Sequence, residues 1–278
     1  MKIIVKPTKD INCYQDVDGF VLPLEDFAVD YRNYYSLDDI KRISLETSKE
    51  VFVVMNKKFK SKELDKLEET LTQLDKLNIT GIFFYDLALL ELKSKLNLQT
   101  DLVWNNTHMV TNYYTANYYG DLGVKYVYLS NEITLEEILE INKRVQVIPI
   151  FMLLGYPVVA FSKRKLVSNS GFSNEVMITE PKSLQQYMVI ESKEGTTFKY
   201  NKVRNNASIL QSLIDSNFPY VYLIEDDLNH ELFMKGVNLT RKFINSEISN
   251  DLYVKSMREL FKGDTGFLYR KTIYKVKK

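Results

Sequence analysis

The sequence contains very little cysteine, because Cys13 is the only one in 278 residues. A single cysteine excludes an internal disulfide framework and fits a chain kept in a reducing compartment. It also excludes a zinc or iron–sulfur site built from several cysteines of this chain. We therefore expect no iron–sulfur cluster here, whereas a divalent metal bound by oxygen and nitrogen ligands stays open.

Long apolar runs and an excess of charge are also absent. Apolar stretches such as 147–154 are strand-sized, well short of the ~18 residues of a membrane span, and the start MKIIVKPTKD has no apolar signal core. Lys and Arg total 37 and Asp and Glu total 36, so the net charge of +1 gives no bulk attraction to nucleic acid. We expect a cytoplasmic protein with no membrane partner.

Several catalytic signatures are missing. No glycine-rich phosphate loop follows the first apolar run, and there is no HExxH, CxxC or Gly-x-Ser-x-Gly motif. No histidine lies near Cys13 in the sequence, which argues against a cysteine protease.

The sequence does contain a regular alternation of short apolar runs with helical patterns. The runs expected to be strands are 2–5, 19–24, 51–55, 81–85, 102–104, 124–129, 147–153 and 220–224. Helical patterns lie between them, and Ser36 and Thr134 precede two of these as N-caps, with Glu137 completing a capping box. Eight alternating strands predict an α/β protein with a (β/α)8 TIM-like barrel. An open α/β sheet is the runner-up, weakened by the missing phosphate loop.

The alternation breaks after the seventh expected strand. Residues 155–182 predict a long irregular loop, and 186–200 predict a β-hairpin around Glu194 and Gly195. We interpret 1–278 as one barrel domain with an insert over about 155–200, ending in a helix and a strand-like segment at 267–276.

Polar residues that follow the expected strands are the candidates for a site, because active sites of such barrels lie at the carboxyl ends of the strands. The candidate catalytic residues are Asp86, His108, Glu132 and Glu225, and the candidate substrate contacts nearby are Asn105 and Asn106. Converging Asp, Glu and His predict acid–base chemistry or a divalent cation. The competing interpretation is that such residues cap helices or pair with Lys and Arg.

The run 162–165 adds a second candidate. Ser162 and Arg164, flanked by two lysines, are suited to holding a phosphate in the loop after the seventh strand. A solvated charged loop is the alternative. Tyr113, Tyr114, Tyr118 and Tyr119 either stack on a ring at the barrel mouth or pack within a helix.

Several segments, in their order and spacing, resemble peptidase family U32. GIFFYDLALLEL is similar to the family's ALIVQDLGLL and aligns Asp86 with its aspartate, and YVYLSNEITLEEI is similar to RVVLSRELSLEEI and aligns Glu132 with its glutamate. EVFVVMNKKF resembles KVYVTLNT, LVWNNTHMVTN resembles LHASTQMNVHN, and YVYLIEDDLN resembles LKIEGR, which aligns Glu225 with a glutamate. The tail TGFLYRKTIYKVKK looks like that of a short subclass from low-GC Gram-positive bacteria.

The resemblance also has departures. The family's block CVAYSGRCLLSN aligns with PVVAFSKRKLVSN, which places Pro157 and Lys165 where cysteines stand, and CAQPC aligns with ITEPK, which places Ile178 and Lys182 there. The resemblance implies that cysteines at these positions hold an iron–sulfur cluster in many members of the family. None of the four residues that replace them here can ligate iron.

Three functions are consistent with these observations. The resemblance favours an auxiliary subunit that pairs with a longer, cluster-bearing relative to hydroxylate the wobble uridine of transfer RNA, meeting the RNA through the complex. The second is a metal-assisted peptidase or hydrolase that uses the four candidate catalytic residues. The third is a small-molecule-binding barrel in which Arg164 holds a phosphate or carboxylate. The family carries a peptidase label, and the sequence leaves open whether this chain is itself an enzyme.

Overall fold

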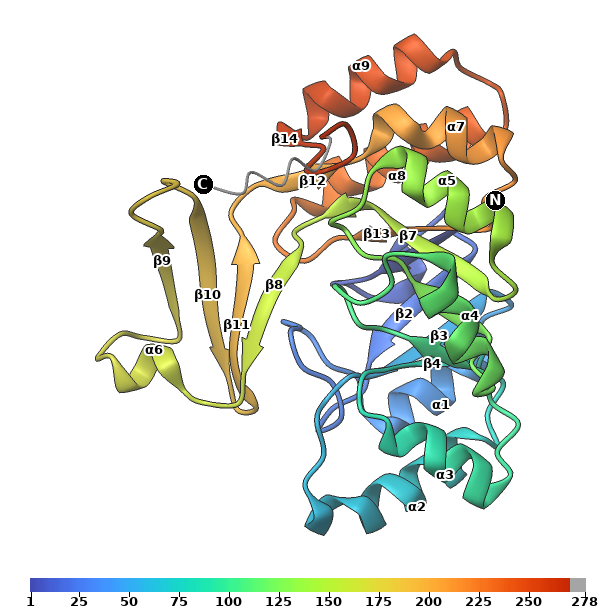
Figure 1. Cartoon of the computed structure of the whole chain (residues 1–278), viewed down its shortest axis with the longest axis vertical. Helices are drawn as coiled ribbons and strands as arrows, with labels where there is room; N and C mark the ends of the chain where they lie inside the picture. The colour runs from blue at the N-terminus through green and yellow to red at the C-terminus, as the bar shows by residue number, and fades with distance from the viewer. Residues whose placement is uncertain (271–278) are drawn as a thin grey trace, which may run out of the picture.

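The structure is a computed structural model and describes residues 1–270. Parallel strands curl into a barrel covered by helices, and a small separate sheet stands beside the barrel (Figure 1). The barrel strands are β1 (Lys2–Lys6), β2 (Gly19–Pro23), β3 (Glu50–Met55), β4 (Gly81–Phe84), β5 (Leu102–Trp104), β6 (Tyr126–Tyr128), β7 (Ile148–Gly155) and β13 (Tyr220–Ile224). The α-helices outside the small sheet are α1 (Leu37–Glu46), α2 (Leu64–Leu74), α3 (Ala88–Leu96), α4 (Tyr113–Asp121), α5 (Leu135–Arg144), α7 (Leu210–Asp215), α8 (His230–Ile244) and α9 (Asn250–Leu260). Short 3-10 helices are η1 (Ile11–Cys13), η2 (Ser61–Glu63) and η3 (Ala207–Ile209).

The barrel closes because its last strand pairs with both the first and the seventh. β13 runs parallel to β1, with Val221 opposite Ile3, and parallel to β7, with Tyr220 opposite Ile150. The other neighbours follow chain order from β1 to β7. The predicted (β/α)8 barrel is confirmed, and the open sheet is wrong. All eight expected strands are present, with ends that differ by one or two residues.

Side chains alternate between the inside and the outside of the barrel along each strand, and this alternation separates two apolar cores. Inward residues such as Phe52 and Phe83 fill the barrel, with their ring centroids 5.7 Å apart and edge to face. Outward residues such as Ile3 and Phe84 pack in a second core together with residues of the surrounding helices. The inner core fills the barrel as far as Tyr222. A ligand can therefore bind only between Tyr222 and the open carboxyl end of the barrel.

The helix starts follow the capping pattern of the sequence. The Ser36 side chain accepts a hydrogen bond from the backbone N–H of Asp39 at the start of α1. Thr134 does the same for Glu137 at the start of α5, and the Glu137 carboxylate accepts from the backbone N–H of Thr134. Both predicted caps are confirmed.

The insert after β7 is a four-stranded antiparallel sheet in the order β8-β11-β10-β9. Its elements are β8 (Val158–Ser162), α6 (Leu166–Asn169), β9 (Glu175–Thr179), β10 (Gln186–Ser192) and β11 (Gly195–Tyr200). The predicted hairpin is β10–β11. The stretch 155–182 is more regular than expected, because β8 and β9 are stabilised by pairing with β11 and β10, which lie further along the chain.

The chain then returns to the barrel and finishes beside it. β12 (Val203–Asn205) pairs antiparallel with β7, and β14 (Gly263–Asp264) pairs with β12. Residues 267–270 of the expected strand-like end form a turn, and the rest of that segment lies outside the described residues.

A buried charge cluster fastens the insert to the barrel. Lys199 of β11 donates a hydrogen bond to Oδ2 of Asp226 at 2.8 Å, and Lys6 of β1 donates to Oδ1 of the same carboxylate. All three side chains are at most 5% exposed. The Thr197 hydroxyl, also on β11, donates to the Asp30 carboxylate in the β2–α1 loop. β11, one of the two inner strands of the insert, is therefore held by two carboxylates of the barrel, those of Asp226 and Asp30.

The pKa values in this cluster follow from burial and from the sharing of one carboxylate. Burial disfavours ionisation of Asp226, but the attraction of Lys6 and Lys199 outweighs it and lowers the pKa of Asp226 to about 2. Burial lowers the pKa of Lys6 to about 8, against the attraction of Asp226. Burial raises the pKa of Asp30, partly offset by its hydrogen bond from Thr197. Asp226 is thus the fixed negative centre of the cluster.

Removal of this negative centre should destabilise the protein strongly. We expect Asp226→Asn to lower the free energy of unfolding by ~3–5 kcal/mol, because two buried ammonium groups lose their counter-charge. Lys199→Met should cost less, since Asp226 keeps Lys6. Urea unfolding measures both. Glu68→Gln, which removes a 3.0 Å ion pair with exposed Lys95, is the control and should cost under ~1 kcal/mol. Equally small losses for Asp226→Asn and Glu68→Gln would contradict the fastening role.

The same carboxylate should impose an acid limit on stability. The folded-state pKa of Asp226 lies below the ~3.9 of an unfolded chain. Its contribution, on the order of 2–3 kcal/mol, is therefore complete above pH ~4 and is lost as the pH falls towards 2. Thermal unfolding from pH 6 to pH 2 measures this, with Lys199→Met as the comparison. The variant should begin to lose stability at a higher pH than the wild type, because one of the two charges that lower the pKa of Asp226 is gone. If both proteins lose stability over the same pH range, this account is wrong.

Candidate functional site

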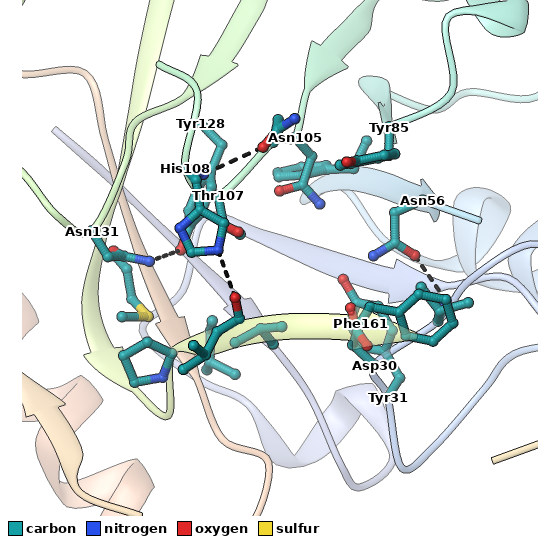
Figure 2. A pocket seen from close by; sticks show the side chains of 18 of the residues that line it. Asp30, Tyr31, Asn56, Tyr85, Asn105, Thr107, His108, Tyr128, Asn131 and Phe161 are labelled. Carbon is teal, nitrogen blue, oxygen red and sulfur yellow. Dashed lines mark hydrogen bonds between the residues drawn. The ribbon is translucent and has the colours of Figure 1, made fainter. Parts of the chain in front are cut away.

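A cavity of about 330 Å³ opens at the carboxyl end of the barrel, with β8 of the insert along one side (Figure 2). Aromatic rings, amides and the charge cluster dominate its lining. The aromatic lining residues are Tyr31, Phe83, Tyr85, Tyr128, Tyr156, Phe161 and Tyr222. The polar lining residues are Lys6, Asp30, Asn56, Lys58, Asn105, Asn106, Thr107, His108, Asn131 and Asp226. The site therefore lies on the face of the barrel that the sequence predicts.

The strand alternation explains why these polar residues face the cavity. Asn56 continues the inward series of Phe52 and Val54 on β3, and Asn105 continues that of Val103 on β5. Tyr85 follows inward Phe83 in the same way. The cavity wall is thus the next inward layer above the barrel core.

Two amide side chains keep hydrogen-bonding groups available to a ligand. The Oδ1 atom of Asn56 accepts from the backbone N–H of Val29 at 2.8 Å, and its Nδ2 has no protein partner within residues 1–270. The Asn105 side chain likewise makes no hydrogen bond to the described part of the chain, whereas its backbone N–H is bound to Phe84. Figure 2 shows Asn56 and Asn105 pointing into the space that Tyr85 and Phe161 border.

A third amide is buried and incompletely satisfied. Asn131 donates from Nδ2 to the Tyr128 hydroxyl at 3.4 Å. Its Oδ1 atom is buried and has no hydrogen-bond partner among the described residues. An acceptor without a donor costs free energy, and because this atom is buried, a bound molecule can donate to it only after the side chain turns towards the cavity.

His108 links the cavity to the insert. Its Nε2 lies 2.9 Å from the backbone carbonyl of Val159 on β8, and its Nδ1 lies 3.6 Å from Oε1 of Glu132. A carbonyl can only accept, so Nε2 carries a proton in this arrangement. The structure therefore brings together two of the candidate catalytic residues, although Glu132 does not itself line the cavity.

The other two candidate catalytic residues point away from the cavity. Asp86 accepts hydrogen bonds from the backbone N–H groups of Phe59, at 2.8 Å, and Ala88, at 3.1 Å, so it fixes a loop and the start of α3. Glu225 is fully buried and accepts from the Thr8 backbone at 2.9 Å and from the Tyr14 hydroxyl.

The Glu225 carboxylate also lies 2.7 Å from Nδ1 of His230. Asp86 and Glu225 both follow the outward positions of their strands. They bind neighbouring parts of the protein, as the alternative interpretation of the sequence expected.

Ser162 is the last residue of β8 and Arg164 lies two residues beyond it, and neither residue lines the cavity. The Ser162 hydroxyl accepts from the Arg164 backbone N–H at 3.2 Å, and the Arg164 carbonyl accepts from the Thr196 hydroxyl at 2.8 Å. Asn106, in contrast, lines the cavity, and its Oδ1 accepts from the His108 backbone N–H at 3.4 Å.

Several lining residues were absent from the sequence-based candidates. Lys6, Asp30, Tyr31 and Tyr85 belong to this group. Lys6 and Tyr85 carry a usable signal, because each stands two residues after an inward apolar residue at the end of a strand. Asp30 and Tyr31 lie in a loop, where periodicity gives no direction.

The positions aligned with the family's cysteines do not fit an iron–sulfur cluster. Pro157 and Lys165 stand at opposite ends of β8, whose five residues span ~16 Å, and Ile178 lies three strands away in β9. None of the side chains can ligate iron, and Cys13 is exposed in η1. The site therefore assigns no role to a cluster bound by this chain.

No group of three or more His, Cys, Asp or Glu side chains within residues 1–270 is arranged to hold a metal ion. No helix in the described range has the length and apolar character needed to cross a membrane.

Known proteins similar to this chain include a transfer RNA hydroxylation protein and a solved structure of a U32 peptidase. The chain is 24% identical over 201 residues to tRNA hydroxylation protein P2 of Bacillus subtilis (strain 168), covering 69% of this chain and 65% of that protein. The chain thus spans less than two thirds of that relative. The structure of the U32 peptidase Mk0906 matches with a TM-score of 0.52 and 16% identity, over 81% of this chain and 92% of the other, which supports the fold.

A family model gives the decisive match. The model of peptidase family U32 matches residues 29–176, just over half of the chain. This range runs from the loop that carries Asp30 through β3–β8 to the first residues of β9. The chain therefore belongs to peptidase family U32.

Proposed function

We propose that this protein is an auxiliary subunit in the hydroxylation of the wobble uridine of transfer RNA, working with a longer U32 relative that carries the iron–sulfur cluster. The observation that carries the proposal is the similarity to a protein named tRNA hydroxylation protein P2. That similarity extends beyond the family match, because it covers 69% of the chain.

The absence of cluster ligands supports a division of labour between two chains. The sequence has one cysteine, which is exposed and lies in η1 near the amino terminus. The aligned positions Pro157, Lys165, Ile178 and Lys182 offer neither thiolates nor a common location. A hydroxylation that depends on a cluster therefore requires a second chain to supply it.

The open barrel mouth supports a role in binding. Its cavity is lined by the amides of Asn56 and Asn105, which have hydrogen-bonding groups without a partner within residues 1–270, and such groups suit a polar ligand. The buried ion cluster around Asp226 lies beside this cavity and joins the insert to the barrel.

A metal-assisted hydrolase has weaker geometric support. Only His108 and Glu132 approach each other among the four residues considered for it, whereas Asp86 and Glu225 are committed to backbone and side-chain partners elsewhere. A phosphate held by Arg164 at the cavity is also poorly supported, because Arg164 lies outside its lining.

Nucleoside mass spectrometry of total transfer RNA tests the proposal. Deletion of the gene should remove or strongly reduce the hydroxylated wobble uridine, and expression of the wild-type chain should restore it. Other modified nucleosides of the same RNA serve as the internal control. A hydroxyuridine level that is unchanged by the deletion, in a cell that makes this modification, would reject the proposed pathway.

The partner is tested separately. A tagged chain isolated from its own cells should bring down a second U32 chain that contains the cysteine block, at near-equal amounts. The tag expressed without the chain is the matched comparison, because it shows which proteins are recovered independently of the chain. Recovery of the wild-type chain as a monomer alone would remove the auxiliary-subunit part of the proposal while leaving the pathway open to test.

A further inference from the structure

We propose that the barrel-mouth cavity of this chain holds one planar, uncharged heterocyclic base of pyrimidine size, turned out of an RNA strand. The RNA as carrier rests on the proposed function, whereas the recognition of the ring rests on the cavity itself. The inference assigns the base-holding step to the chain that lacks the cluster ligands.

The size of the cavity sets the first limit. Its volume of about 330 Å³ is at the lower end of the ~300–1,000 Å³ range of ligand sites. Such a space takes a single ring with part of its sugar and has no room for neighbouring nucleotides. A base inside a duplex cannot reach it, so the ring has to leave its stack.

A rigid aromatic surface is available for stacking. Tyr85 lines the cavity and lies nearly parallel to Trp104, with 6.2 Å between ring centroids and 20° between planes. Trp104 stacks in turn on Tyr119 at 4.3 Å and 21°. The tyrosine is therefore backed by two further rings and loses little freedom when a base stacks on it.

The polar groups match the edge of a base. Each carboxamide offers a donor and an acceptor side by side, as the N–H and C=O edge of a pyrimidine does. Asn105 has both groups available and Asn56 has its Nδ2, and both point into the same space (Figure 2). Asn131 also lines the cavity, but its Oδ1 atom is buried, so the polar match rests on Asn56 and Asn105.

The charges of the cavity favour a neutral ring over an anion. Lys6 and Lys199 bring two positive charges to the floor, and the carboxylates of Asp226 and Asp30 bring two negative charges when both are ionised, so the formal charges cancel. The Lys58 ammonium lies 5.0 Å from the centroid of the Tyr85 ring and has no carboxylate partner within residues 1–270. A base that stacks on Tyr85 has to share the ring with Lys58 or displace its ammonium, which is then free to meet a phosphate of the strand that carries the base.

Photocrosslinking tests where the base goes. A transfer RNA transcript with 4-thiouridine in place of uridine is bound to the purified full-length protein, with its partner chain if the two co-purify, and irradiated. Peptide mass spectrometry should find the adducts on residues that line the cavity, chiefly around Tyr85 and Asn105. Adducts confined to surfaces outside the cavity, or no adduct at all despite RNA binding, would overturn the inference.

Matched variants make the result specific. Tyr85→Ala and Asn105→Ala should each reduce the cavity adduct by about fivefold or more, the effect expected for loss of a stacked ring or of an amide contact. Tyr114→Ala, which removes a ring that is 74% exposed on α4, should leave the adduct unchanged. Asn105→Asp preserves the size of the side chain and tests the amide if the alanine variant does not fold. Equal yields from all variants would overturn the inference.

The nucleotide within the adduct separates this inference from the proposed function. A cavity adduct from a uridine other than the wobble position keeps the base-holding role and removes the proposed modification site. A wobble-uridine adduct found only outside the cavity keeps the proposed modification site and removes the base-holding role of the cavity. A last experiment uses free 4-thiouridine at the same concentration as the RNA. If the free nucleoside labels the cavity as strongly as the RNA does, the inference that an RNA strand carries the base is overturned.

Discussion

One carboxylate, that of Asp226, shared between the ammonium groups of Lys6 and Lys199, joins parts of the molecule that are far apart in the sequence. Lys6 ends the first barrel strand, Asp226 follows the last, and Lys199 belongs to the inserted sheet. The insert carries β8, which borders the cavity, and the His108 ring meets a carbonyl of that strand. The shape of the site therefore depends on an ion cluster below it. Buried ions of this kind are costly to separate, which gives the insert a defined position on the barrel.

The alternation of side chains on the barrel strands decides which polar residues can meet a ligand. Asn56, Tyr85 and Asn105 stand in inward register and face the cavity, whereas Asp86 and Glu225 stand one position out of register and bind neighbouring loops. A carboxylate directly after a barrel strand is thus not by itself a catalytic group. The register of the strand before it has to be read first.

The barrel could be predicted from the sequence because its strands are short apolar runs with clear boundaries, and because the caps at Ser36 and Thr134 have a local physical cause. The position of the insert could be predicted from the sequence, but only part of its strand pairing could. The hairpin β10–β11 is local, whereas β8 and β9 depend on partners further along the chain.

The site was harder to predict than the fold. His108, Asn105 and Asn106 follow a strand and were found by position, but Lys6 and Asp30 meet only through the tertiary structure. A buried lysine such as Lys199 looks in the sequence like any polar residue of an exposed hairpin. Its role follows from Asp226, which no local pattern connects to it.

The ion cluster also has a consequence for the order in which the chain folds. Lys199 lacks its ion-pair partner until Asp226 has been synthesised, 27 residues later, and the barrel cannot close until β13 lies between β1 and β7. Contacts between distant residues form late, because the loop that joins them must first be closed. In a chain growing on the ribosome, Asp226 therefore cannot hold the insert until β13 has emerged. The complete cavity at the carboxyl end of the strands forms only after the whole barrel has been made.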